Sequence, residues 1–370
     1  MASKRSRAGV RNRVRIDPLD VARAALERPV VTARVTTQVA IAYDPYLAGR
    51  VVERASGVAE IPDGEPVPWT AIVKRTEGAG LQAGRRELSA YRHGIASAQT
   101  GRGLRAPKLL AWQDDASDVE LWLEEVRDAY NGQWPVSRFE VAARHIAAWD
   151  ARAGNSPLPA NFDSEDAWAE RHGQPHRLHE ALAELDSLAD SPSADKAAAQ
   201  LGDPGFRRTR ALITSTPSRI ERLATFPQTP LHHDLVRSNL FAVDDSSTVA
   251  IDWENVGRGP LGVDLAPLVI GSVRRGEAAS EDLGQIESLV LAGYIAGLRD
   301  AGLDADRAVR SAYRLAVGLR WHVVLGGIGA SLDPTRAFRG SRLDEPQTES
   351  LRHLVAVSRH ILDVAESVAD

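Results

Sequence analysis

The segment from Pro230 to Pro267 constrains the fold of this chain more than any other. It reads PLHHDLVRSNLFAVDDSSTVAIDWENVGRGPLGVDLAP. Two short apolar runs, 240–243 and 248–251, enclose the polar turn 244–247, and this pattern predicts a β-hairpin. We therefore expect the polar residues before the first strand to lie beside the residue that follows the second.

Four polar residues surround this hairpin. His232, Asp234 and Asn239 precede it, and Asp252 follows it. A carboxylate that can orient a hydroxyl, with an amide and a second carboxylate as hard oxygen ligands, suits Mg²⁺-assisted phosphoryl transfer. Each residue alone is more often structural, because an isolated Asp commonly forms a turn and an isolated His is commonly a hydrogen-bonded core residue. The four together favour a functional site.

This pattern resembles the catalytic loop and metal-binding Asp of the aminoglycoside phosphotransferase and choline kinase-like family, distant relatives of protein kinases. That family carries His-Gly-Asp-x-x-x-x-Asn followed by Ile-Asp-x-Glu. His233 replaces the usual Gly, so we expect a backbone there that does not require glycine. Asp252, Trp253 and Glu254 stand where protein kinases have Asp-Phe-Gly, which favours the small-molecule branch. The resemblance implies an α+β, bilobal kinase-like fold, with a small β-rich N-lobe containing one main helix and a larger α-helical C-lobe.

Composition limits the class of protein. A length of 370 residues suits two lobes, and a net charge of −5 gives no electrostatic case for a nucleic-acid partner. The chain has no cysteine, which excludes disulfides and Cys-ligated zinc. The N-terminus lacks the apolar core of a secretory signal, and the apolar run 315–332 is interrupted by Arg320 and His322. We expect a cytoplasmic protein with no membrane partner; its oligomeric state is not readable.

The first lobe is expected over residues 16–126, after a disordered basic tail at 1–15. A helix should begin with Asp17 as its cap and Pro18 in its first turn, and run to about residue 28. β-branched, alternating runs predict five strands, at 30–39, 49–54, 69–75, 107–112 and 119–125. The loop 43–48 stands where a phosphate-covering loop is expected, but it lacks GxGxxG and reads equally well as a hairpin loop.

Two pairs in this lobe are candidates for nucleotide binding. Lys74 ends the third strand and Glu87 lies thirteen residues later in a helical segment, a spacing that resembles the kinase ion pair on the α- and β-phosphates. Structurally, each could instead be a solvated charge. The segment LWLEEV resembles the family's hinge, which implies that the carbonyl of Glu124 and the N–H of Val126 bind the adenine edge of ATP, or the corresponding edge of GTP.

The remainder, 127–370, is expected to be a helical C-lobe. Helices are predicted at 137–151, 164–190, 193–201, 206–225, 280–301, 304–329 and 346–368. Ser137, with Glu140 three residues later, predicts a capping box for the first of these. The resemblance gives Asp264 a buttressing role. His232 is expected to brace the catalytic loop.

The expected acceptor is a small molecule with a hydroxyl group, but the sequence gives little indication of which molecule it is. Trp149, Trp253 and Trp321 could stack on a sugar or base, although a helix-borne Trp is more often core. A cationic aminoglycoside calls for acidic side chains, and Glu254 is the one well-placed candidate. The Arg- and Ala-rich composition is typical of GC-rich genomes of antibiotic producers.

The implied reaction moves the γ-phosphoryl group of a nucleotide to that hydroxyl. Asp234 would orient the hydroxyl and take its proton, Asn239 and Asp252 would hold Mg²⁺, and Lys74, fixed by Glu87, would hold the other phosphates. The favoured function is that of an antibiotic O-phosphotransferase, which acts on an aminoglycoside or on a sugar- or nucleoside-containing antibiotic and so confers resistance. A metabolic kinase for a sugar, choline-like or homoserine-like substrate is the second, and a nucleotide-binding pseudokinase is the third.

Overall fold

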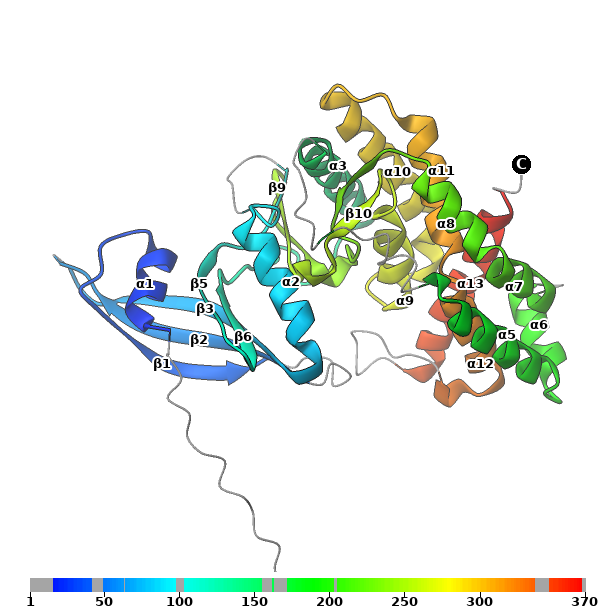
Figure 1. The fold of residues 1–370 in the computed structure, drawn as a ribbon, viewed down its shortest axis with the longest axis horizontal. Coiled ribbons are helices and arrows are strands. Elements are labelled where there is room, and N and C mark those ends of the chain that lie inside the picture. The colour runs from blue at the N-terminus through cyan, green and yellow to red at the C-terminus, as the bar shows by residue number, and fades with distance from the viewer. Residues whose placement is uncertain are drawn as a thin grey trace, which may run out of the picture. The chain divides into compact units, whose positions relative to one another are not determined.

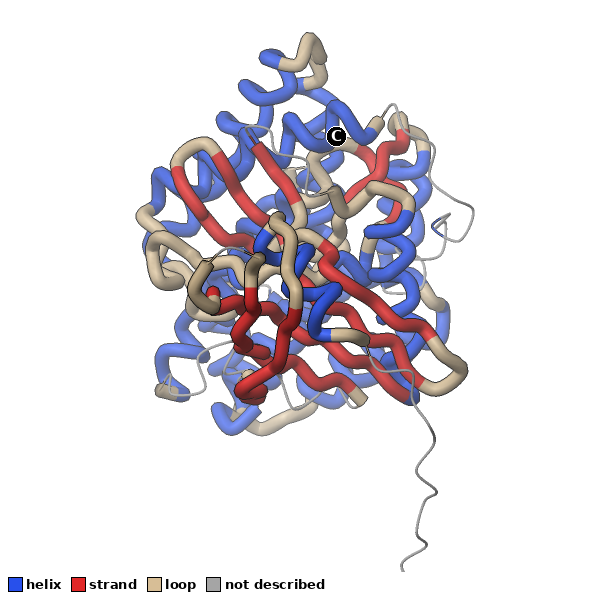
Figure 2. The backbone as a smooth tube through the Cα atoms, turned by 90° about the vertical axis from the view of Figure 1, so that its left-hand side faces the viewer, coloured by secondary structure: helices blue, strands red, loops and turns tan. Residues whose placement is uncertain are grey.

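The computed structural model describes residues 16–41, 49–62, 64–97, 103–154, 162, 172–202, 205–336 and 346–367. The chain divides into two compact units, one formed by residues up to 81 with 108–125, the other by 82–107 with 126–370. Figure 1 follows their elements in chain order, and Figure 2 distinguishes helices, strands and loops. The predicted tail 1–15 and the loop 43–48 lie outside the described residues.

The first unit is a five-stranded sheet in the order β1-β2-β3-β6-β5, in which every neighbouring pair is antiparallel. All five predicted strands are present, with these bounds: β1 Thr32–Ala40, β2 Arg50–Glu60, β3 Val67–Glu77, β5 Leu109–Asp114 and β6 Asp118–Leu123. Alternation along β3 buries Trp69, Ala71 and Val73 in one core with Val21 and Ala22 of α1. This core fixes the sheet face on which α1 packs.

Helix α1 (Pro18–Leu26) begins as its sequence predicts. The side chain of Asp17 accepts a hydrogen bond from Leu19 N at 2.9 Å, and Pro18 occupies the first turn, where a missing N–H costs no helical hydrogen bond. The helix ends at Glu27, whose φ of +51° lies in the left-handed region.

The second unit combines helix α2 (Leu81–Arg92) with five short strands and the remaining helices. The predicted hairpin is confirmed as β8 (Leu240–Asp244) and β9 (Ser247–Ala250), and β4 (Gly103–Arg105) adds to β9 in parallel. A separate antiparallel pair joins β7 (Gln228–Leu231) to β10 (Gly257–Pro260). The sequence did not indicate β4, β7 or β10, because they are three or four residues long and have no clear alternation.

The helices of this unit enclose one large apolar core. They are α3 Val136–Ala153, α5 Pro175–Ala189, α6 Ala194–Leu201, α7 Gly205–Thr214, α8 Thr216–Ala224, α9 Ser272–Arg274, α10 Leu283–Asp300, α11 Asp306–Gly318, α12 Trp321–Leu332 and α13 Gln347–Glu366. A π-helical segment, Pro267–Gly271, precedes α9.

Three helix predictions need correction. The segment 206–225 forms two helices, because Pro217 lies in the first turn of the second, where its missing N–H is tolerated. The segment 304–329 also divides, where Gly318 ends α11 beside the guanidinium of Arg219. Ser137 is not the cap of α3: the helix begins at Val136, so Ser137 already lies within the first turn.

No single described helix is long and apolar enough to span a membrane. Helices α11 and α12 together meet the requirements of length and composition, with a bend of 41° between them.

Helices α3 and α10 approach each other closely. A Cβ atom at Gly297 would lie 2.6 Å from the backbone oxygen of Arg144, and one at Gly293 would collide with the backbone oxygen of Glu140. These two glycines, one helical turn apart on α10, therefore let the backbones of the two helices come into contact. This contact positions the buried side chains between the helices.

Candidate active site

Asp234 is held by Asn239. The side-chain nitrogen of Asn239 donates to the backbone oxygen of Asp234 at 2.9 Å and to its Oδ2 at 3.3 Å. A turn of 3₁₀ helix at Arg237–Asn239 brings the two residues back together after five positions. The carboxylate therefore has a defined orientation before any ligand binds.

Ile251 joins the end of the hairpin to this loop. Its N–H donates to the backbone oxygen of Asn239 at 2.9 Å, and its carbonyl oxygen accepts from His232 Nε2 at 2.9 Å. Asp252 follows directly, so the hairpin brings it beside the loop that carries Asp234, as the sequence predicts. The pKa of His232 reflects both carboxylates, since the charges of Asp234 and Asp252 each raise it.

His232 is a neutral brace in this structure. It is fully buried, and burial lowers its pKa more than the neighbouring carboxylates raise it. The N–H of Asp234 approaches His232 Nδ1 at 3.3 Å, so Nδ1 accepts and the proton is on Nε2, which donates to Ile251. The imidazole thus links Asp234 of the loop to Ile251, the residue that follows β9.

Two site residues have unusual backbones. His233 has a φ of +66° and Asp252 a φ of +67°, both in the left-handed region. The position of His233 thus adopts a conformation that glycine favours but that histidine can enter at a cost of about 1–3 kcal/mol. The His233 imidazole contacts the backbone oxygen of Arg258 at 3.0 Å, which helps to hold it there.

Asp264 lies beneath the loop and is fully buried. Its two oxygens accept hydrogen bonds from the backbone N–H groups of His232 and His233, each at 2.8 Å. Burial raises the pKa of Asp264 to about 7, against the opposing effect of these two hydrogen bonds. Both bonds use the ionised carboxylate as acceptor, so the loop is held most firmly when Asp264 carries its charge.

Arg237, which the sequence analysis did not single out, anchors the loop from another side. Its guanidinium bonds Asp128 Oδ2 at 2.7 Å and lies 5.3 Å from the ring centre of Trp134, while its N–H donates to Ser272 Oγ at 3.1 Å. A buried Arg paired to a partly buried acid is a specific arrangement. Asp128 and Arg237 are more than a hundred residues apart in the sequence, so no local sequence pattern predicts their contact.

Three carboxylates gather at the other edge of the loop. Glu87 of α2, Asp252 and Glu254 each offer an oxygen, and these oxygens lie within 4.8 Å of one another. Arg86 Nε donates to the backbone oxygen of Val256 at 2.9 Å, which ties α2 to the segment after Asp252. The sequence placed Glu87 and Glu254 in different roles, and the structure brings both to Asp252.

The three tryptophans are core residues. Trp253 is fully buried, its Nε1 donates to Ala250 O, and its ring lies 5.3 Å from that of Trp149 and 4.6 Å from that of His232. Trp149 and Trp321 are each 7% exposed. Rings buried to this extent are not exposed for stacking on a substrate, and they pack in the apolar core instead.

The remaining candidates are divided between the two units. Lys74 is a buried residue of β3, opposite Leu121 of β6. Glu124 follows β6, where its N–H and its side chain both bond the backbone of Lys108. The first unit ends at Glu125 and Val126 begins the next segment of the second. Glu87 also belongs to the second unit, so the Lys74–Glu87 pair stays a prediction.

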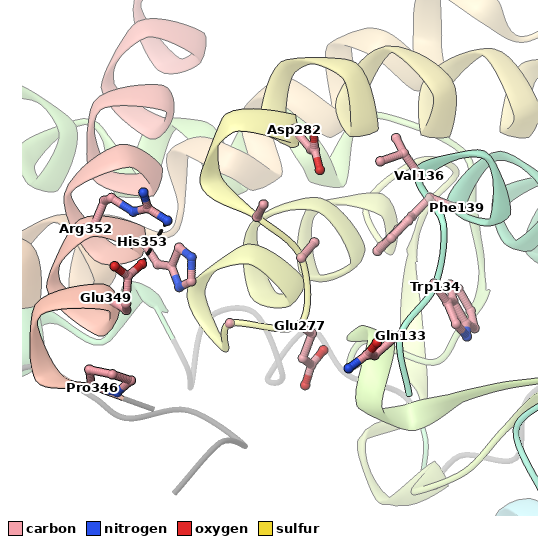
Figure 3. A pocket seen from close by; sticks show the side chains of 13 residues that line it. Gln133, Trp134, Val136, Phe139, Glu277, Asp282, Pro346, Glu349, Arg352 and His353 are labelled. Atoms are coloured by element: carbon pink, nitrogen blue, oxygen red, sulfur yellow. Dashed lines mark ion pairs between the residues drawn. The ribbon is translucent and has the colours of Figure 1, made fainter. Parts of the chain in front are cut away.

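A cavity of about 650 Å³ opens in the second unit near the catalytic loop (Figure 3). Glu349 and His353 lie on one side of it and Trp134 and Phe139 on the other, with Glu277 and Asp282 between them. Glu277 Oε2 accepts from the backbone N–H of Ser238 at 3.0 Å. Since Ser238 precedes Asn239, this wall of the cavity is bonded directly to the loop.

Comparisons with known proteins show the family and the fold of this chain. The model of the phosphotransferase enzyme family matches residues 67–303, more than half of the chain. An aminoglycoside phosphotransferase structure from Alicyclobacillus acidocaldarius is similar with a TM-score of 0.51 at 15% identity, covering 98% of this chain and 99% of that one. This likeness confirms the expected kinase-like fold.

Two further structures are similar at lower scores. An amicoumacin kinase in complex with AMP-PNP and Ca²⁺ has a TM-score of 0.48 at 13% identity, with 88% of this chain and 90% of that chain covered. An aminoglycoside phosphotransferase from Streptomyces rimosus has a TM-score of 0.45 at 18% identity, with 77% and 92% covered. A comparison with curated proteins finds no match.

Proposed function

Because the chain belongs to the phosphotransferase enzyme family, a family of small-molecule kinases, we propose that it transfers the γ-phosphoryl group of ATP or GTP to a hydroxyl of a small molecule. The main support for this proposal is that the Asn239 side chain hydrogen-bonds Asp234 and so orients its carboxylate. Asp234 accepts the acceptor's hydroxyl proton as the new O–P bond forms and the bond from the γ-phosphorus to the nucleoside diphosphate breaks.

The donor set around Asp252 fits a hard divalent cation. The carboxylates of Asp252, Glu87 and Glu254 converge, and Asn239 has its amide nitrogen directed to Asp234, which leaves the amide oxygen as a ligand. We propose that Asn239 and Asp252 hold Mg²⁺, as the family resemblance implies. When bound, Mg²⁺ offsets the negative charge of the phosphate oxygens.

For the nucleotide we keep the pairs expected from sequence. Lys74 would contact the non-transferring phosphates, and the backbone of Glu124 and Val126 would bind the base. Glu87 has two candidate roles, as the partner of Lys74 or as a further cation ligand. Glu87→Gln separates them: a higher KM for nucleotide with unchanged Mg²⁺ dependence supports the Lys74 role, and a shifted Mg²⁺ dependence supports the ligand role.

We place the acceptor in the cavity of Figure 3 because its wall is bonded to the catalytic loop through Glu277 and Ser238. Its volume lies in the usual range of small-molecule sites, about 300–1,000 Å³. Three acidic side chains line the cavity, Glu277, Asp282 and Glu349, against one arginine and one histidine, and Arg352 pairs with Glu349 at 2.8 Å. That charge favours a cationic, hydroxyl-bearing acceptor such as an aminoglycoside, although Arg275 contributes a positive charge near Ser238.

An antibiotic-modifying enzyme that confers resistance is therefore our first candidate. A metabolic kinase for an amino alcohol fits the same acidic lining and stays the second. A pseudokinase is the third, and the intact set of Asp234, Asn239 and Asp252 weighs against it. The cytoplasmic location and the absence of a nucleic-acid partner stay predictions.

The experiment is ADP release with ATP and with GTP, with and without Mg²⁺, against a panel of acceptors. The panel contains aminoglycosides, nucleoside and peptide antibiotics, sugars and amino alcohols. Turnover that requires one acceptor class establishes the kinase and names its substrate. Nucleotide binding without turnover on any acceptor supports the pseudokinase, and no nucleotide binding contradicts the proposal.

A further inference from the structure

Asp150 of α3 is a fully buried acid that the proposed reaction does not use. Its Oδ2 accepts a hydrogen bond of 2.5 Å from the hydroxyl of Tyr294 on α10, which is also fully buried. The Tyr294 hydroxyl in turn accepts from the N–H of Gly262 at 3.2 Å. The second oxygen of Asp150 has no hydrogen-bond partner in the described part of the chain. Such a group is costly to bury and calls for an explanation.

The pair contacts both segments that support the catalytic loop. The backbone oxygen of Asp150 accepts from Thr229 Oγ1 at 3.3 Å, and Thr229 lies in β7, three residues before His232. Gly262 lies two residues before Asp264, and its φ of +95° marks a turn there. Since β7 and β10 pair with each other, the two contacts secure both sides of the same strand pair.

Close packing of α3 and α10 builds this arrangement. Gly293 and Gly297 flank Tyr294 and remove the side chains that would hold the helices apart. Tyr294 is thereby brought to Asp150, which lies near the end of α3. The hydrogen bond is therefore fixed by the packing of two long helices rather than by a flexible loop.

We propose that Asp150 and Tyr294 are a positioning pair for the catalytic loop: they fix Gly262, and through it the Asp264 carboxylate that holds the backbone of His232 and His233. This inference rests on the proposed function. It adds two residues that touch neither the nucleotide nor the acceptor. They act on Asp234 through Asp264 and the backbone.

The two buried acids, Asp150 and Asp264, differ in their electrostatic surroundings. Burial, and then the charge of Asp264, raise the pKa of Asp150 well above its usual range, while the Tyr294 bond lowers it. Burial and Asp150 likewise raise the pKa of Tyr294. Of the two acids, Asp264 has two backbone N–H donors that stabilise a negative charge, whereas Asp150 has the single Tyr294 hydroxyl.

The groups that face Asp264 come from several elements. The N–H groups of His232 and His233 favour its ionised form, as does the charge of Arg320, whereas Asp234 disfavours it. Asp150 and Tyr294 face it from α3 and α10. If Gly262 shifts, the two N–H bonds to Asp264 weaken, so its pKa rises and the ionised form is lost at a higher pH.

The test compares Tyr294→Phe with Tyr313→Phe. Tyr313 is a second buried tyrosine, whose pKa is raised by burial and by Glu287; it bonds neither Asp150 nor Gly262 in the described hydrogen bonds, so it controls for loss of a buried hydroxyl. We expect Tyr294→Phe to lower kcat about 5- to 100-fold, the range for one lost buried hydrogen bond, with the KM for ATP within about twofold. The acid limb of its kcat profile should also move to higher pH, and that of Tyr313→Phe should not.

A second readout needs no turnover. Hydrogen–deuterium exchange of peptides covering 229–239, measured at one pH, should be faster in Tyr294→Phe than in wild type or Tyr313→Phe. Equal exchange and an equal acid limb in the two variants would overturn the inference, even if both were less stable. If Tyr294→Phe does not fold, Thr229→Val removes the hydrogen bond from Thr229 to the backbone oxygen of Asp150. We then expect exchange of the same peptides to be faster than in wild type, by a smaller factor. Faster exchange in a protein that turns over no acceptor would retain the positioning pair and refute the proposed function.

Discussion

Asn239 holds Asp234 through two contacts from one amide nitrogen, at 2.9 Å to the backbone oxygen and 3.3 Å to the carboxylate. Because the nitrogen serves the carboxylate, the amide oxygen is left for a cation. One side chain thereby links the proposed base to the proposed metal site. The backbone of Asn239 adds a third link, since its oxygen accepts from Ile251, the residue before Asp252.

Replacement of Asn239 by Ala should therefore damage both parts of the site. We expect ADP release with a productive acceptor to fall at least about 100-fold, the usual effect of losing one oriented polar group. The Mg²⁺ concentration for half-maximal activity should rise as well. Steady-state rates over a Mg²⁺ series measure both. A lower rate with an unchanged Mg²⁺ dependence would remove Asn239 from the metal site.

Asp264 should give stability an unusual pH dependence. Its pKa is about 7 in the folded protein and 3.8 in the reference state. Between these values the folded protein keeps a proton that the unfolded chain has lost, so the free energy of unfolding decreases as pH rises through this window. Over the whole window the change is on the order of 4 kcal/mol. Activity should have the opposite trend, because the loop needs the ionised carboxylate.

The check is denaturant unfolding of wild type and Asp264→Asn between pH 4 and pH 7.5. As pH rises over this range, the free energy of unfolding should decrease less in the variant than in wild type, by about 4 kcal/mol. Parallel pH dependences would show that Asp264 is not protonated in the folded state.

Trp253 should behave as a core residue. Trp253→Ala removes a fully buried ring in contact with Trp149 and His232, and we expect a loss of about 3–5 kcal/mol in the free energy of unfolding. Trp112, which is 43% exposed, is the matched control, and Trp112→Ala should cost much less. Chemical denaturation gives both values. A large rise in acceptor KM without a loss of stability would restore the stacking role.

The catalytic hairpin was predictable because its order along the chain is nearly its order in space. The runs before and after 244–247 pair with each other, so Asp234, Asn239 and Asp252 meet through local structure alone. The five strands of the first unit were predictable for the same reason, since alternation and turn residues mark each one.

The supports of the loop were not predictable in this way. Asp128 and Arg237, or Asp150 and Tyr294, are separated by more than a hundred residues and carry no pattern of their own. Their contacts depend on how helices pack, which periodicity does not specify. For Trp253 the sequence left two roles open, stacking on a substrate or packing in the core, and in the structure its ring is fully buried.

The most direct test of the central claim is Asp234→Ala, studied by nucleotide binding and by turnover together. Calorimetric titration with ATP and Mg²⁺ should give nearly wild-type affinity, because Asp234 acts on the acceptor hydroxyl. Acceptor-dependent ADP release should fall about 10²–10⁴-fold, the usual contribution of a general base. Full turnover in the variant, or nucleotide affinity lost while turnover persists, would contradict the role of Asp234.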